Sequence, residues 1–137
     1  MWNPYQNIWG EIISLPMSVD IGAFVDIGNP DFGEDCVIQA FVSIPPGWKF
    51  GKKVFIGPGA RFANDKHPDL NDKEWKPQGG EVKDGAVIGM GALIGSGITI
   101  GRNAVVGMGA VVLQSIPEGE TWVGNPAHKI SETLWKT

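Results

Sequence analysis

The sequence predicts an all-β domain in which short parallel strands wind around a single core as a β-helix. Three observations predict it. An aliphatic or aromatic residue recurs every sixth position, a second apolar residue stands four positions after it, and glycine often follows the first directly. Twenty glycines and ten prolines in 137 residues would suit a disordered chain if they were scattered, but here the glycines are periodic.

The first apolar series fixes the period. A helix repeats every 3.6 residues and a strand every two, so a period of six fits neither. It fits a short strand with one inward side chain and a sharp turn with a second, and three such units make a coil of about eighteen residues. The series comprises Leu15, Ile21, Ile27, Phe32, Ile38, Ile44, Phe50, Ile56, Phe62, Val82, Ile88, Ile94, Ile100, Val106 and Val112.

The second apolar series supplies the inward side chain of each turn. Its members are Val19, Val25, Cys36, Val42, Trp48, Val54, Ala60, Ala86, Ala92, Ile98, Ala104, Ala110 and Ile116. Stacked coils lie about 4.8 Å apart and contact only their neighbours, so both ends of the stack need caps. We expect residues 1–12 and 128–137 to cap the ends, the latter as a short helix, within one domain over 1–137.

The composition excludes several classes of partner. A net charge of −4 without a cluster of Lys and Arg argues against nucleic acid and anionic membranes. The uncharged run 85–101 is shorter than the roughly 20 residues of a membrane helix and is rich in glycine. The single cysteine, Cys36, fits a reducing compartment, and the N-terminus lacks the pattern of a signal peptide. We therefore expect a cytoplasmic protein.

One polar segment interrupts the period. Between Phe62 and Val82 the chain carries Asn64, Asp65 and His67 within four residues, and we expect an inserted loop over about 63–81. A β-helix has flat faces, so such an insertion creates a ledge where a site can form. Asn and Asp are also common turn formers, so a purely structural role for these residues stays open.

The motifs resemble a known superfamily. The repeat [Leu/Ile/Val]-Gly-x-x-[small]-x over 22–130 resembles that of the hexapeptide acyltransferases. The elements FANDKHP at 62–68, Trp75, VKDGAVIG at 82–89 and VGNPA at 123–127 resemble the bacterial N-acetyltransferases that act on nucleotide-linked amino sugars. This chain has Asp69 where that subgroup usually has arginine. The resemblance implies a left-handed β-helix and a homotrimer in which each loop reaches over a neighbouring subunit.

The resemblance also implies an activity. We expect an acetyl-CoA-dependent N-acetyltransferase acting on the amino group of a nucleotide-linked amino sugar, in the synthesis of surface glycans such as lipopolysaccharide, without a metal. Asn64 can bind the acceptor amine or a hydroxyl, and Asp65 can attract its ammonium form. His67 can accept a proton near neutral pH. These three are the candidate catalytic residues.

Further candidates concern the two substrates. Along the C-terminal coils, Gly91, Gly109 and Ala110 are small enough to let pantetheine approach the backbone, and Pro126 and Lys129 follow, the latter a candidate for the phosphates of coenzyme A. For the acceptor, the candidates are Gln39, Phe41 and Trp75, the last by stacking. Coil geometry, packing and solvation remain alternative explanations for each of them.

Three other functions were weighed against this one. His67-Pro68 also resembles the catalytic His-Pro of sugar O-acetyltransferases, which would make His67 a general base acting on a hydroxyl. A non-catalytic structural or assembly module is the alternative from another class. A γ-class carbonic anhydrase needs three zinc-binding histidines, whereas this chain has only His67 and His128.

Overall fold

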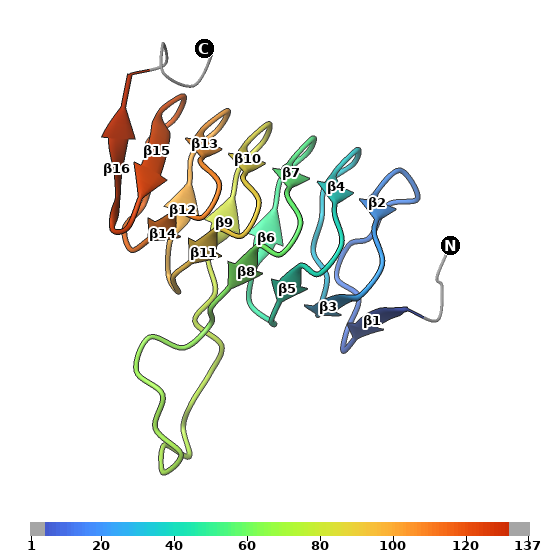
Figure 1. Cartoon of the computed structure of the whole chain (residues 1–137). Helices are drawn as coiled ribbons and strands as arrows, with labels where there is room; N and C mark the ends of the chain where they lie inside the picture. The colour runs from blue at the N-terminus through green and yellow to red at the C-terminus, as the bar shows by residue number, and fades with distance from the viewer. Residues whose placement is uncertain (1–4, 132–137) are drawn as a thin grey trace.

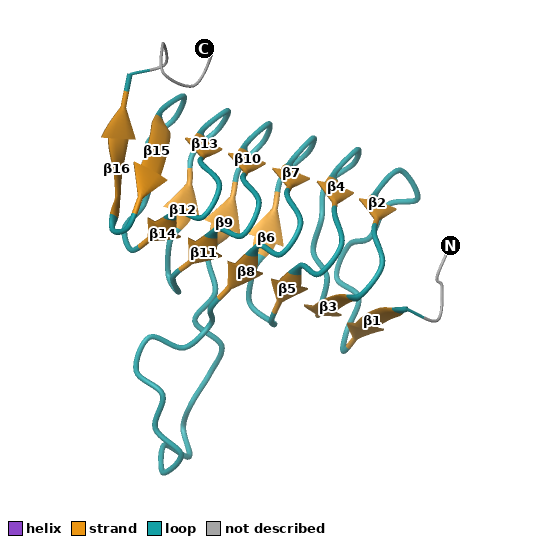
Figure 2. Ribbon diagram, in the orientation of Figure 1, coloured by secondary structure: helices purple, strands orange, loops and turns teal. Residues whose placement is uncertain are grey.

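The computed structural model describes residues 5–131, and its backbone winds into a three-sided prism of short strands (Figure 1). No helix occurs among these residues (Figure 2). The strands are β1 (Gln6–Trp9), β2 (Asp20–Ile21), β3 (Val25–Gly28), β4 (Val37–Ile38), β5 (Ser43–Ile44), β6 (Lys49–Phe50), β7 (Phe55–Ile56), β8 (Arg61–Phe62), β9 (Glu81–Val82), β10 (Val87–Ile88), β11 (Leu93–Ile94), β12 (Thr99–Ile100), β13 (Val105–Val106), β14 (Val111–Val112), β15 (Thr121–Gly124) and β16 (Ala127–Ile130).

Three sheets form the sides of the prism. Face A has the order β1-β3-β5-β8-β11-β14, face B the order β12-β9-β6, and face C the order β16-β15-β13-β10-β7-β4-β2. Neighbouring strands are parallel except β15 and β16, and Val87 pairs with Val105, eighteen residues further on. The predicted all-β parallel β-helix is therefore confirmed, and the sheet order agrees with the left-handed form.

The core consists of the two apolar series. Every buried hydrophobic residue in the described part of the chain belongs to one of them, apart from Ala127. Because each strand and each turn offers one inward side chain, the interior consists of columns of mostly aliphatic residues stacked from coil to coil. Under the inserted loop these columns become aromatic: Trp48 and Phe62 pack edge-on at 5.0 Å between ring centroids, and Phe50 lies 5.5 Å from Phe62.

The two ends of the prism differ. At the C-terminal end, β16 turns back at Asn125-Pro126 and pairs antiparallel with β15. The predicted helix over 128–137 is therefore wrong for His128–Ile130, which extend face C because β15 offers a free edge there; residues 132–137 lie outside the described residues. At the N-terminal end, Leu15 and Ile21 of the first series are only half-buried, since no further coil among residues 5–131 covers them.

The turns between the faces form three corners, named here by the faces they join. Corner CA contains the turns that end at Phe24, Phe41, Gly59, Gly91 and Gly109, all with positive φ. Corner AB contains the turn at Pro46-Gly47, and the inserted loop leaves from it between β8 and β9. Corner BC joins face B to the following strand of face C. Face A thus lies between the loop and corner CA.

Candidate active site

The inserted loop, residues 63–80, is the single large departure from the coil in the described residues. It leaves corner AB between β8 and β9 and projects well away from the prism (Figure 1). The predicted loop over about 63–81 is confirmed, with Glu81 already paired in β9. Nearly all of its side chains between 66 and 78 are exposed, so the loop has no core of its own.

Asn64 fastens the neck of the loop. Its side-chain Nδ2 donates to the backbone carbonyl oxygen of Pro46 at 3.0 Å. The backbone carbonyl oxygen of Asn64 accepts from the backbone N–H of Gln78 at 2.7 Å. The Trp48 Nε1 donates to the carbonyl oxygen of Ala63 at 2.8 Å. Two of these bonds tie the first arm of the neck to the coil, and the bond from Gln78 ties the second arm to the first. Asn64 is therefore a structural residue through Nδ2, and Oδ1 is the part of its side chain left for a ligand.

Asp65 and His67 form a turn inside the loop. The Asp65 Oδ1 accepts from the His67 backbone N–H at 3.1 Å, which is an Asx turn. Asp69 and Asp72 make the same contact two residues ahead, so three aspartates shape the loop. The His67 ring is exposed and makes no hydrogen bond with the described residues. Asp65 thus serves the loop's backbone, and His67 remains free to meet a ligand.

The outer part of the loop exposes two large apolar side chains. Leu70 is fully exposed, and Trp75 is 40% exposed. Apolar side chains at the end of a projecting loop are typical of a surface that another molecule covers. The Trp75 ring makes no contact with another aromatic ring among the described residues. Its role as a stacking residue therefore stays a prediction.

The candidates for binding coenzyme A occupy different surroundings. Gly91 and Gly109 lie at corner CA with open space where a side chain would stand. Ala110 is wholly buried in the core, so its methyl group packs inside the coil and only Gly91 and Gly109 present bare backbone. Pro126 and Lys129 are exposed in the β15–β16 hairpin, where Lys129 Nζ lies 3.4 Å from the Glu120 carboxylate. Glu120 thus neutralises part of the positive charge with which Lys129 is expected to bind a phosphate.

Gln39 and Phe41 lie at corner CA, two coils before Gly91. Gln39 is exposed and lines a pocket of about 390 Å³ together with Asp20 and Pro58. Phe41 is 56% exposed, and its ring stacks on that of Phe24, which the sequence interpretation missed. The sequence does contain a signal for this pair, because Phe24 and Phe41 each stand three residues after a member of the first apolar series.

The fold therefore brings the candidates together in two groups within one chain. Asn64, Asp65, His67 and Trp75 belong to the loop at corner AB. Gln39, Phe41, Gly91 and Gly109 line up along corner CA. Face A separates the groups, and it carries a small apolar groove of about 230 Å³ lined by Arg61, Leu93 and Leu113.

A family model described as bacterial transferase hexapeptide (six repeats) matches residues 79–114. That segment contains β9 to β14, where the six-residue period is unbroken. Residues 79–114 therefore carry the hexapeptide repeat described for bacterial transferases. A search of curated proteins finds no significant match to the sequence.

Solved structures share the hexapeptide coil. A GDP-perosamine N-acetyl transferase from Caulobacter crescentus, in complex with CoA and GDP-perosamine, is 22% identical with a TM-score of 0.63, over 93% of this chain and 54% of that one. WeeI from Acinetobacter baumannii is 26% identical with a TM-score of 0.60, over 93% and 56%. A hexapeptide-repeat containing acetyltransferase from Vibrio cholerae is 23% identical with a TM-score of 0.63, over 92% and 69%. This chain thus spans little more than half the length of two of these proteins.

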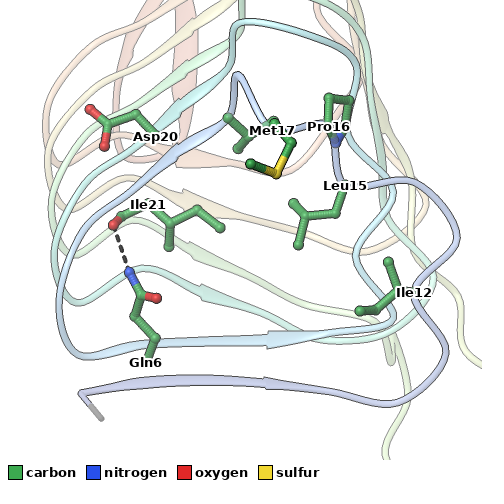
Figure 3. Close-up of a pocket in the computed structure, with 8 residues that line it drawn as sticks. Gln6, Ile12, Leu15, Pro16, Met17, Asp20 and Ile21 are labelled. Atoms are coloured by element: carbon green, nitrogen blue, oxygen red, sulfur yellow. Dashed lines mark hydrogen bonds between the residues drawn. The ribbon is translucent and has the colours of Figure 1, made fainter. Parts of the chain in front are cut away.

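An open cavity at the N-terminal end of the hexapeptide coil adjoins the pocket beside Gln39, since Asp20 lines both. It has a volume of about 450 Å³, and Ile12, Leu15 and Met17 line it, as Figure 3 shows. The Gln6 Nε2 donates to the carbonyl oxygen of Ile21 at 2.7 Å and closes one side. The cavity is the uncovered end of the core and holds no cluster of reactive groups.

Residues 5–131 contain neither a metal-binding cluster nor a membrane-spanning helix. No group of three or more His, Cys, Asp or Glu side chains there lies close enough to hold a metal ion. His67 and His128 belong to separate segments, the loop and β16. Nor does this part of the chain form a helix with the length and apolar character needed to cross a membrane.

Proposed function

We propose that this chain is an acetyl-CoA-dependent N-acetyltransferase that acts on the amino group of a nucleotide-linked amino sugar. The observation that carries the proposal is the polar loop: one anchored insertion, bearing Asn64, Asp65 and His67, on a hexapeptide coil. A protein with the same fold is a GDP-perosamine N-acetyl transferase, and its complex holds CoA and GDP-perosamine. That likeness supports both substrates of the proposed reaction.

The reaction needs positioned donors and acceptors more than a strong nucleophile. The lone pair of a neutral amine attacks the thioester carbonyl, and the tetrahedral intermediate places negative charge on the former carbonyl oxygen. Collapse breaks the C–S bond, the amine nitrogen loses one proton, and the thiolate of coenzyme A takes up one. A primary amine is already a good nucleophile, so holding it in line with the thioester contributes most of the rate.

The loop residues can each serve a step of this reaction. The Asn64 Oδ1 is the acceptor that remains after Nδ2 has bound Pro46, so it suits an amine N–H. The exposed carboxylate oxygen of Asp65 that does not serve the Asx turn can attract the ammonium form of the acceptor. The free ring of His67 can take the proton that the amine releases.

Corner CA fits the acyl donor. Gly91 and Gly109 leave open space beside their backbone, which a pantetheine chain would fill. Pro126 and Lys129 lie beyond them on the C-terminal hairpin, and Lys129 can meet a phosphate by exchanging Glu120 for it. Bound there, acetyl-CoA would supply the thioester that the amine attacks.

The two groups of residues require an assembly. Within one chain the loop and corner CA lie on opposite edges of face A, so a complete site needs the loop of one chain against corner CA of another. A cyclic homotrimer satisfies this geometry three times over. We place the enzyme in the cytoplasm, in the synthesis of surface glycans such as lipopolysaccharide.

The experiment incubates the purified protein with acetyl-CoA and a panel of nucleotide-linked amino sugars while thiol release is followed. We expect Asn64→Ala to lower kcat/KM about a hundredfold with little change in the KM for acetyl-CoA. Asn71→Ala, the same substitution in the same loop, is the matched control and should retain full activity. Full activity in both Asn64→Ala and Asp65→Ala would overturn the site assignment.

The exposed, unpaired ring of His67 also favours a second function, O-acetylation of a sugar hydroxyl. A hydroxyl needs a general base, whereas a neutral amine does not, so the two reactions separate at this residue. His67→Ala should reduce turnover less than about tenfold for amine transfer, and by several hundredfold or more for hydroxyl transfer. His128→Ala is the matched control, because this second histidine lies on β16 away from the loop.

A further inference from the structure

Two phenylalanines at corner CA adopt a backbone conformation that bulky residues avoid. Phe24 has φ 58° and Phe41 has φ 65°, in the left-handed region. The equivalent positions of the later coils are Gly59, Gly91 and Gly109 with φ between 67° and 74°. The turn therefore suits glycine, and each phenylalanine costs free energy that glycine would not.

The rings do not compensate for this by packing in the core. Phe24 is 55% exposed and Phe41 is 56% exposed. Their centroids lie 5.3 Å apart with an interplanar angle of 11°, so the rings are offset-stacked along the coil axis. Tyr5 lies 5.2 Å from Phe24 on the opposite side. Gly59 follows Phe41 in this column and carries no ring, so the stack ends with an aromatic face turned toward bare backbone.

A shallow pocket of mixed polarity adjoins the stack, and Val37, Ile38 and Pro58 form much of its apolar part. Asp20, Gln39 and Ala40 line it, and Ala40 directly precedes Phe41. The Asp20 carboxylate is exposed and takes no part in an ion pair with any described residue. An aromatic face beside a carboxylate and an amide suits a ring with one apolar face, hydroxyl groups at its edge and a positive charge.

The charge of the surrounding coils points the same way. Residues 1–48 contain six carboxylates, those of Glu11, Asp20, Asp26, Asp31, Glu34 and Asp35, and no Lys or Arg. The rest of the chain has eleven cations and nine carboxylates. The N-terminal coils therefore attract an ammonium group and repel a pyrophosphate.

We propose that the Phe24–Phe41 stack and the Asp20–Gln39 pocket form a subsite for the ammonium-bearing sugar ring of the acceptor. The inference rests on the proposed N-acetyltransferase function and extends it by assigning the ring, rather than the phosphates, to the N-terminal coils. The C–H face of the pyranose stacks on Phe41, a hydroxyl bonds the Gln39 amide, and Asp20 attracts the ammonium group. Any phosphate of the acceptor is held away from these coils.

The substitution Phe41→Gly tests the subsite without endangering the turn. Glycine is the residue that the later coils use at this position, so the variant should keep its Tm within about 3 °C or raise it. The probe is methyl glucosaminide, followed by saturation-transfer NMR without acetyl-CoA, with methyl glucoside as the neutral comparison. We expect binding of methyl glucosaminide to weaken about tenfold in Phe41→Gly and in Asp20→Asn.

The comparisons between probes and variants decide the outcome. Asp20→Asn should affect methyl glucosaminide but not methyl glucoside, because only the former carries the charge. Asp35→Asn is the matched control, since Asp35 lies at the turn before β4 and away from the pocket. Binding unchanged in both Phe41→Gly and Asp20→Asn would overturn the subsite. A lower molar mass of Phe41→Gly in solution would overturn it too, because the ring would then serve contact between subunits.

Thiol release separates this inference from the proposed function. If no acceptor in the panel releases thiol but Phe41→Gly still weakens probe binding, the subsite stands and the acetyl transfer fails. If acceptors are acetylated and Phe41→Gly leaves their KM unchanged, the transfer stands and the subsite fails. The expected result for a working subsite is an acceptor KM about tenfold higher in Phe41→Gly, with the KM for acetyl-CoA unchanged.

Discussion

The coils before the loop and the coils after it follow one backbone plan but differ on their surfaces. Before the loop, the first two corner CA positions hold Phe24 and Phe41 and the third holds Gly59, and every charged side chain up to residue 48 is acidic. After it, the same positions hold glycine, the second inward series is mostly alanine, and the family model matches. The coil fixes two inward positions in six, so its other positions are free to carry different chemistry.

The two ends of the stack differ in a related way. The last coil is covered by the β15–β16 hairpin, whereas the first leaves Leu15 and Ile21 half-buried around an open cavity. Each coil is stabilised by its neighbours on both sides, so a coil with one neighbour contributes less to stability. The N-terminal end should therefore be the weaker end of the prism.

The largest expected effect tests this difference between the two regions directly. Ile88 is completely buried between two coils, so Ile88→Ala should lower the free energy of unfolding by about 3–4 kcal/mol. Ile21→Ala makes the same change in the open first coil, where about 1 kcal/mol is expected because the side chain is already partly solvated. Urea denaturation monitored by circular dichroism measures both. Equal losses would show that the first coil is as well packed as the interior.

Glycine makes a second contrast, within one turn. A Cβ at Gly89 would lie 2.5 Å from the backbone nitrogen of Met108, so the next coil would have to move. A Cβ at Gly91 would meet nothing within 4 Å, although its φ of 69° still disfavours alanine. We expect Gly89→Ala to cost about 3 kcal/mol and Gly91→Ala about 1 kcal/mol. The same denaturation assay ranks them, and the reverse order would contradict the close approach at Gly89.

The sequence predicted the coil well because its pattern is dictated by the core. Ile88 and Ala92 must both point inward, and no tertiary detail alters that. The position of the loop could be predicted, but the roles of its residues could not. Nothing in the sequence shows that the Asn64 side chain bonds to Pro46, eighteen positions earlier in the preceding coil. The tail was misjudged because the edge of β15 favours a strand over 127–130 regardless of helix propensity.

The neck of the loop provides the third prediction. Asn64→Ala removes the hydrogen bond to Pro46, which should cost about 1 kcal/mol and let the loop move away from corner AB. The loop contains Lys66 and Lys73, so trypsin should cleave the variant faster than the wild type. Asn71→Ala alters the loop beyond the neck and should leave the rate of cleavage unchanged. Equal cleavage of all three proteins would show that Asn64 does not anchor the neck.

The smallest effect concerns Cys36 in the second inward series. Burial raises the pKa of its thiol above the ordinary value of 9.0, and the S–H donates to the carbonyl oxygen of Gly51 at 3.0 Å. The folded chain therefore keeps this proton at a pH where the unfolded chain has lost it, so stability is full below pH 9 and falls above it. The loss is at most about 1.4 kcal/mol per pH unit. Urea denaturation from pH 7 to 10 should show a steeper fall for the wild type than for Cys36→Ala, which lacks the thiol. Parallel curves would mean that the thiol ionises as readily in the folded chain as in the unfolded one.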